Sequence, residues 1–96
     1  MILFGLDCIS EFANAHPDAE SPLKSWRKMV ETGAFKHLVD LKQSFGSVDY
    51  VKPYTVFDIG GNKYRLISRV SYESETVGIM GIYTHSEYDQ GKWRKL

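Results

Sequence analysis

The chain has 96 residues, 43% of them hydrophobic, which is enough for one domain (residues 1–96) that buries about 60–65% of its unfolded surface. Twelve basic and twelve acidic residues cancel, so total charge gives no argument for nucleic-acid binding, and a local patch has to supply one. The single cysteine excludes an intrachain disulfide. The N-terminus lacks the basic start of a signal peptide, and no apolar run approaches the roughly 20 residues that span a membrane. We therefore expect a cytoplasmic protein with no membrane contact.

The N-terminal segment predicts a buried strand followed by a helix. Residues 2–6 are a continuous apolar run that is short enough for a strand. Asp7 is suited to cap the next helix, and Pro17 ends it. The positions that give this helix its periodicity are Ile9, Phe12, Ala13 and His16. At the end of the helix, His16 is favoured as a helix-end residue rather than as a chemical group.

Two more helices are predicted before the chain turns to strands. Ser21 before Pro22 is a strong start signal, since serine caps free N–H groups and proline suits the first helical position. This helix is expected to end near Gly33. Its apolar stripe consists of Leu23, Trp26, Met29 and Val30. Residues 35–45 carry a shorter helical pattern at Leu38, Leu41 and Phe45.

The C-terminal half predicts three consecutive strands. Residues 46–53 are turn-rich and are interpreted as a connection. Strands are expected at 54–59, 63–72 and 76–83, and Gly60, Gly61 and Asn62 tolerate the backbone angles of the first turn. Tight turns between successive strands make an antiparallel meander. The order of elements therefore indicates an α+β fold, with helices packed on one face of a small twisted antiparallel sheet.

The middle strand separates an apolar face from a charged one. One face suits a core, and its side chains are Tyr64, Leu66, Ser68, Val70 and Tyr72. The other face carries the cations Lys63, Arg65 and Arg69. Residues two apart on this face lie roughly 7 Å from each other along the strand, comparable to the spacing of phosphates in a single-stranded nucleic acid. This face is expected to be open to solvent. It is either a nucleic-acid contact or an ordinary solvated strand surface.

A short motif near the C-terminus supplies proton-transfer groups. If Thr84 caps a terminal helical turn, His85 and Tyr88 share a face. Histidine acts as acid or base near neutrality, whereas tyrosine, with a pKa of about 10, serves as a proton donor or a stacking platform. The alternative is a capped turn in which both side chains only pack. Glu87 and Asp89 are two residues apart, and side chains at this spacing on a helix point in different directions. They are therefore not expected to bind one metal ion together.

Two strings resemble a known family. The first is Asp-Ile-Gly-Gly-Asn-Lys-Tyr-Arg-Leu-Ile at residues 58–67, and the second is Tyr-Thr-His-Ser-Glu-Tyr-Asp at residues 83–89. Together with the link at 16–20 and the tryptophan-bearing helix, they resemble the HigB toxins of bacterial type II toxin–antitoxin systems. The resemblance covers nearly the whole chain. It implies a RelE-like fold, with two N-terminal helices on one sheet face and an RNA-binding surface on the other.

The resemblance also implies a function and a site. The expected activity is that of an mRNA interferase, an endoribonuclease that cuts mRNA on the ribosome by attack of the 2′-hydroxyl, without metal or cofactor. The expected partners are mRNA, the ribosome and a helix-turn-helix antitoxin of the HigA type. The expected catalytic residues are Lys63, Arg65, His85 and Tyr88. The expected RNA-binding residues are Asn62, Lys63, Arg65 and Arg69.

One position departs from the family pattern. HigB and RelE-type toxins carry an arginine on the last strand a few residues before the Thr-His pair, and the corresponding residue here is Met80. A thioether cannot stabilise charge on a phosphate as a guanidinium does. Either Arg65 and Arg69 carry that load, or the protein is a weakened or inactive toxin, or the sequence holds a change made to permit expression.

Three functions are therefore compared. The first is the endoribonuclease toxin. The second is a catalytically weakened or inactive module of the same fold that binds RNA or the antitoxin. The third is an interaction domain whose basic strand is incidental. Growth arrest with cleaved message separates the first from the others, and RNA or ribosome binding without cleavage separates the second from the third.

Overall fold

The chain runs through a strand, a group of helices and then the remaining strands, as the sequence predicts. The computed structural model describes residues 1–95. Its elements are β1 (Ile2–Phe4), α1 (Leu6–Ala15), the short 3-10 helix η1 (Pro17–Ala19), α2 (Glu20–Thr32), α3 (Leu38–Ser44), β2 (Asp49–Val51), β3 (Tyr54–Ile59), β4 (Tyr64–Ser71), β5 (Thr76–Thr84), α4 (His85–Asp89) and the 3-10 helix η2 (Lys92–Lys95). The predicted α+β class is confirmed.

All five strands form one sheet in the order β1-β5-β4-β3-β2. The predicted meander is β3-β4-β5, and its first strand has the predicted bounds. β2 is antiparallel to β3, whereas β1 runs parallel to β5. The sheet is therefore mixed, and the expectation of a wholly antiparallel sheet is wrong for β1. A long connection through helices lets the chain return in the same direction, which a tight turn does not.

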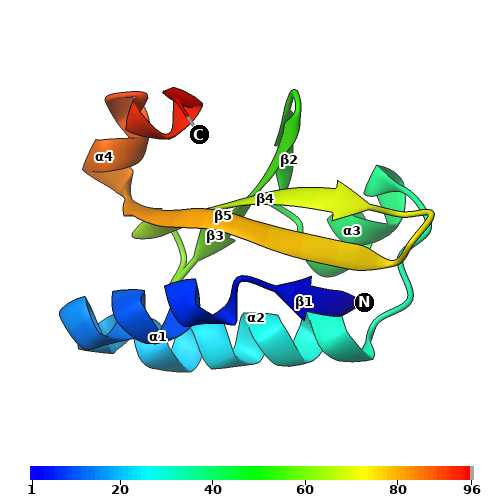
Figure 1. Cartoon of the computed structure of the whole chain (residues 1–96), viewed down its shortest axis with the longest axis horizontal. Helices are drawn as coiled ribbons and strands as arrows, with labels where there is room; N and C mark the ends of the chain where they lie inside the picture. The colour runs from blue at the N-terminus through cyan, green and yellow to red at the C-terminus, as the bar shows by residue number, and fades with distance from the viewer. Residues whose placement is uncertain (96) are drawn as a thin grey trace.

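The two faces of the sheet are covered unequally. In Figure 1, α1 and α2 lie together beneath one face, and α4 with η2 stands over one end of the other. The main core lies under the helices, where Leu23, Trp26 and Val30 of α2 are buried and the Trp26 ring meets Phe57 edge-on at 5.3 Å. A smaller cluster lies on the opposite face. Its buried members are Tyr54, Val56, Ile67 and Trp93.

The first helix begins differently from the prediction. Gly5, rather than Asp7, occupies the N-cap position, with a left-handed φ of 84°. A Cβ at Gly5 would lie 2.7 Å from the carbonyl oxygen of Ile79 on β5. Close approach of the two backbones thus requires glycine at this turn, and Asp7 falls within the first helical turn.

The second helix also starts earlier than predicted. α2 continues directly from η1, because Ala19 is fully buried and holds the link against the core, so Ser21 lies inside the helix rather than at its cap. Met29 was expected in the apolar stripe but is exposed. α2 has 13 residues, and none of the helices in the described part of the chain combines the length and the apolar character needed to cross a bilayer.

The segment between α2 and β3 is more ordered than the sequence indicates. α3 begins at Leu38, where His37 and Asp40 form a capping box, and is shorter than the predicted 35–45. Residues 46–53 were interpreted as a connection, yet they contain β2, which pairs with β3 through Asp49 and Val56. β2 has three residues, too few for an alternating pattern to be visible in the sequence.

Candidate nucleic-acid interface

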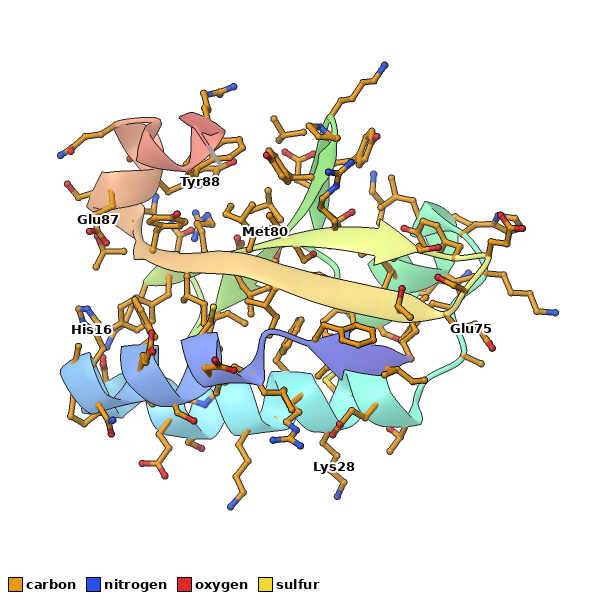
Figure 2. All side chains as sticks on the ribbon, in the orientation of Figure 1. His16, Lys28, Glu75, Met80, Glu87 and Tyr88 are labelled. Atoms are coloured by element: carbon orange, nitrogen blue, oxygen red, sulfur yellow. The ribbon has the colours of Figure 1, made fainter. Side chains whose placement is uncertain are left out.

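The sheet face turned away from α1 and α2 carries most of the charged and aromatic residues expected at the site. We call it the open face and define it by Asp58, Arg65, Arg69, Met80 and Tyr83. Residues paired directly across strands place their side chains on the same side of a sheet. Arg65 pairs with Asp58 on one side and Tyr83 on the other. Figure 2 shows Met80 and Tyr88 on this side of β5, with His16 on the helix side.

Arg65 is held at the centre of the open face by several partners. Its Nε lies 3.1 Å from Asp58 Oδ1, and its Nη2 donates to Asn62 Oδ1 at 2.6 Å. The guanidinium carbon stands 5.5 Å from the centre of the Tyr88 ring, within the range of a cation–π contact. The side chain is only 11% exposed. The expected solvent-facing arginine is instead a fixed cation that its neighbours largely enclose.

Tyr88 lies between Arg65 and the C-terminal tryptophan. Its ring stacks on Trp93 at 5.0 Å with an interplanar angle of 5°, and Trp93 Nε1 donates to the Tyr88 carbonyl oxygen at 3.0 Å. Burial raises the pKa of the Tyr88 hydroxyl, and the nearby Asp49 carboxylate raises it further, while Arg65 acts in the opposite direction. The hydroxyl therefore stays protonated well above neutral pH and is available as a proton donor.

His85 occupies the first position of α4, and its cap is the predicted one. The Thr84 hydroxyl accepts from the Glu87 amide, and the Glu87 carboxylate accepts from the Thr84 amide. Glu87 thus has a structural role at the helix start. His85 Nδ1 lies 2.8 Å from Asp89 Oδ2, which leaves Nε2 for another partner. His85 and Tyr88 both lie on α4, but they contact different partners. His85 contacts Asp89, whereas Tyr88 contacts Trp93 and Arg65.

Lys63 does not lie in line with Arg65 and Arg69. β4 begins at Tyr64, and Lys63 in the preceding turn places its Nζ 3.2 Å from Asp18 Oδ2 on η1. The Tyr64 hydroxyl donates to the same carboxylate. That hydrogen bond, together with Lys63, lowers the pKa of Asp18. The predicted row of three cations is therefore wrong, because an acidic residue of the link draws the lysine to the helix side.

Arg69 and Met80 extend the open face away from α4. Arg69 is exposed and pairs with Gly78. The register between β4 and β5 shifts at Met80, because Ile67 pairs with Gly81 and the next residue of β4 pairs with Ile79. Met80 is thus the extra residue of a β-bulge, and it is 37% exposed. Bulges redirect side chains, and here the bulge leaves the thioether at the surface.

The structure adds residues that the sequence prediction omitted. Asp58 anchors Arg65 and could have been found from the hairpin register, which places the two residues opposite each other. Asp49 and Trp93 come from segments with no strand or helix signal, so nothing in the sequence placed them beside Tyr88. No three His, Cys, Asp or Glu side chains gather as a metal-binding group within residues 1–95.

Comparison with known proteins gives a consistent result. A model of the HigB toxin family, described as the RelE-like toxic component of a toxin–antitoxin system, matches residues 19–91. An mRNA interferase toxin HigB of Escherichia coli K12 is 32% identical over 92 residues, which cover 93% of this chain and 88% of the relative. An mRNA interferase HigB of Shigella flexneri matches to the same extent, and one of Escherichia coli O6:H1 is 25% identical over 83 residues. The family model covers α2, α3, α4 and the strands β2 to β5, and the chain belongs to the HigB toxin family.

Proposed function

We propose that this protein is an mRNA interferase, an endoribonuclease that cuts mRNA and acts as the toxin of a type II toxin–antitoxin pair. Family membership and the activity named for its relatives support the proposal. The observation that carries it is the arrangement of Arg65 on the open face, fixed by Asp58 and Asn62 over the ring of Tyr88, whose hydroxyl has a raised pKa. A fixed cation next to a proton donor matches the needs of phosphodiester cleavage.

The chemistry uses the 2′-hydroxyl of the RNA as nucleophile. A base removes its proton, the oxygen attacks the adjacent phosphorus, and an acid protonates the departing 5′-oxygen. His85 fits the base, because a neutral imidazole that donates from Nδ1 to Asp89 has its lone pair on Nε2. Tyr88 fits the acid, and Arg65 stabilises the charge that builds on the phosphate. These side chains supply both proton transfers and need no metal or cofactor.

Substrate binding is assigned to the residues around this centre. Arg69 extends the open face, and Asn62 orients Arg65. Lys63 is largely exposed and pairs with the exposed carboxylate of Asp18, so an RNA phosphate can take the place of this carboxylate at small energetic cost. A formal net charge of zero gives little long-range attraction to RNA. We therefore propose that the ribosome holds the strand, and that cleavage depends on it.

The partners and the compartment follow from this role. A toxin that cuts translated mRNA acts in the cytoplasm, and it requires an inhibitor when it is not needed. We propose a cognate helix-turn-helix antitoxin of the HigA type as that inhibitor. A small reading frame with this pattern beside the gene for this chain would support the pairing, and co-purification of the two proteins would test it.

The first experiment is induction of the chain in bacteria without an antitoxin. Growth is expected to stop, and translated messages are expected to be cut. Arg65→Ala should lose both effects, because it removes the cation that Asp58 and Asn62 fix over the Tyr88 ring. Arg27→Ala is the matched control, because Arg27 is also ion-paired, to Glu31 at 3.1 Å, but lies on α2 beneath the sheet. A folded Arg65→Ala that remains fully toxic would overturn the assignment.

Met80 favours a second candidate, a weakened or inactive module that binds RNA or the antitoxin without efficient cleavage. The bulge holds a neutral thioether where the family pattern has an arginine. Under this alternative, the protein associates with programmed ribosomes, yet the message stays intact. Co-sedimentation with ribosomes, followed by mapping of message ends in the same sample, separates the two candidates.

A further inference from the structure

A pair of exposed apolar side chains lies on the open face at the edge of the sheet, away from the proposed cleavage centre. Along β1, Leu3 is buried in the main core, whereas Ile2 and Phe4 are 63% and 59% exposed. Side chains alternate along a strand, so Ile2 and Phe4 point to the side opposite the helices. Aromatic side chains on an exposed sheet face can stack on nucleobases, as they do in RNA-binding sheets.

The register places Phe4 opposite a gap. Gly78 on β5 pairs with Phe4 on one side and with Arg69 on the other. A Cβ added at Gly78 would find only the Arg69 carbonyl oxygen within 4 Å, at 3.9 Å. The space above Gly78 is therefore open. It is bordered by Phe4 and Arg69, whose Cα atoms are two strand spacings, or roughly 10 Å, apart.

The Phe4 ring, the open space above Gly78 and the Arg69 guanidinium together suit a nucleotide of a single strand. A nucleobase can stack on the Phe4 ring above Gly78, while Arg69 binds a phosphate of the same strand. Within the described residues, Arg69 has no ion-pair partner, and it lies on the same strand and face as Arg65. An acidic peptide would also be attracted to these arginines, but a flat aromatic ring beside an open gap favours a planar base as the occupant.

We propose that Phe4, Gly78 and Arg69 form a nucleobase-binding site that positions the single-stranded RNA substrate. The proposal rests on the proposed endoribonuclease function, because Arg65 defines where the scissile phosphate lies. Arg65 and Arg69 are four residues apart on β4, roughly 13 Å along the strand. At roughly 7 Å between phosphates, the base on Phe4 therefore belongs to a nucleotide about two positions away from the scissile bond. Phe4 is a positioning residue and affects substrate binding more than the chemical step.

The test measures single-turnover cleavage of an mRNA on programmed ribosomes at increasing concentrations of the full chain. Phe4→Ala is expected to raise the half-saturating concentration roughly 5- to 150-fold, the effect of losing one stacked base, with a much smaller change in the maximal rate. Phe4→Trp should keep the half-saturating concentration near the wild-type value, whereas Phe4→Leu should raise it. Ile2→Ala is the matched control, since Ile2 is equally exposed on the same strand but faces Thr76 rather than the gap.

A second variant tests the gap independently of the ring. Gly78→Val puts a β-branched side chain into the open space, where a strand tolerates it, and should weaken binding as Phe4→Ala does. Thermal unfolding confirms that each variant is folded. The proposal is overturned if Phe4→Ala and Gly78→Val cleave like the wild type, or if Phe4→Leu equals Phe4→Trp.

Two further outcomes would identify another occupant and also overturn the proposal. In one, Phe4→Ala leaves cleavage unchanged but weakens binding of the antitoxin. In the other, it leaves cleavage unchanged but dissociates a dimer seen in sedimentation. Failure of the proposed function looks different, because the wild-type chain would then cut no message at all on the ribosome.

Discussion

At the scale of single residues, Arg65 shows how a charge can be both buried and available. Asp58 and Asn62 hold its Nε and Nη2, its Nη1 donates to the carbonyl oxygens of Asn62 and Tyr64, and its guanidinium carbon stands over the ring of Tyr88. Such support fixes the cation before substrate arrives, so little reorganisation is needed when charge develops on the phosphate. Arginine offers five donors, and lysine cannot replace them at a site of this kind.

Tyr88 makes a prediction about pH. Burial raises its pKa, so the protonated hydroxyl persists to higher pH than that of an ordinary tyrosine. If Tyr88 is the acid, single-turnover cleavage should show no alkaline decline up to about pH 9, because the donor is still protonated there. Tyr88→Phe should be slower by about 10²–10⁴-fold across this range. A folded Tyr88→Phe that cleaves at the wild-type rate across this range would contradict the assigned role.

Met80 makes a prediction about rate. The bulge leaves its side chain partly exposed on the open face, so an arginine can be accommodated there without burying its charge. If this is the phosphate-contacting position, Met80→Arg should raise the cleavage rate by about 10²–10³-fold, the effect of one well-placed charged donor. Met80→Leu is the control of similar size. A folded Met80→Arg with an unchanged rate would show that the position does not contact the phosphate.

At the scale of elements, the hairpin was predictable and its surroundings were not. Gly60 and Gly61 have positive φ, as a turn between β3 and β4 requires, and local turn chemistry is visible in a sequence. The ion pair of Lys63 could not be predicted, because its partner Asp18 lies in η1, which is distant in the sequence. The edge strands β1 and β2 have three residues each, and long-range pairing rather than local pattern fixes their place.

The contact between η1 and the hairpin turn makes a prediction about stability. The Tyr64 hydroxyl bond, and then Lys63, lower the pKa of Asp18, so its charged form stabilises the fold above its ordinary pKa of about 4. That contribution is lost as pH falls through the lowered folded value. Asp18→Asn should therefore lower Tm at pH 7, and the difference from wild type should shrink below about pH 4.

Glu20→Gln is the control for this measurement, because Glu20 is also an exposed acid at the same link. It is expected to leave Tm nearly unchanged at both pH values. A difference between Asp18→Asn and wild type that stayed constant from pH 7 to pH 3 would show that the carboxylate charge does not stabilise this contact.

At the scale of the whole molecule, the two sheet faces have different tasks. The helices cover one face with the main core, and this layering was predictable from apolar periodicity in α1 and α2. Arg65, His85 and Tyr88 were predicted as site residues from their chemistry together with the family resemblance. Their supports, Asp58, Asp89 and Trp93, come from pairings and tail packing that side-chain chemistry alone does not reveal.

The central claim is that the open face cuts mRNA by attack of the 2′-hydroxyl. The most direct measurement compares two ribosome-bound mRNAs, one with ribose throughout and one with a 2′-deoxy nucleotide at the scissile position. The ends of the products are mapped for both. We predict that the ribose message yields a 2′,3′-cyclic or 3′-phosphate and a 5′-hydroxyl, and that the deoxy message remains bound but uncut. Efficient cutting of the deoxy message, or a 5′-phosphate on the downstream fragment, would contradict the account.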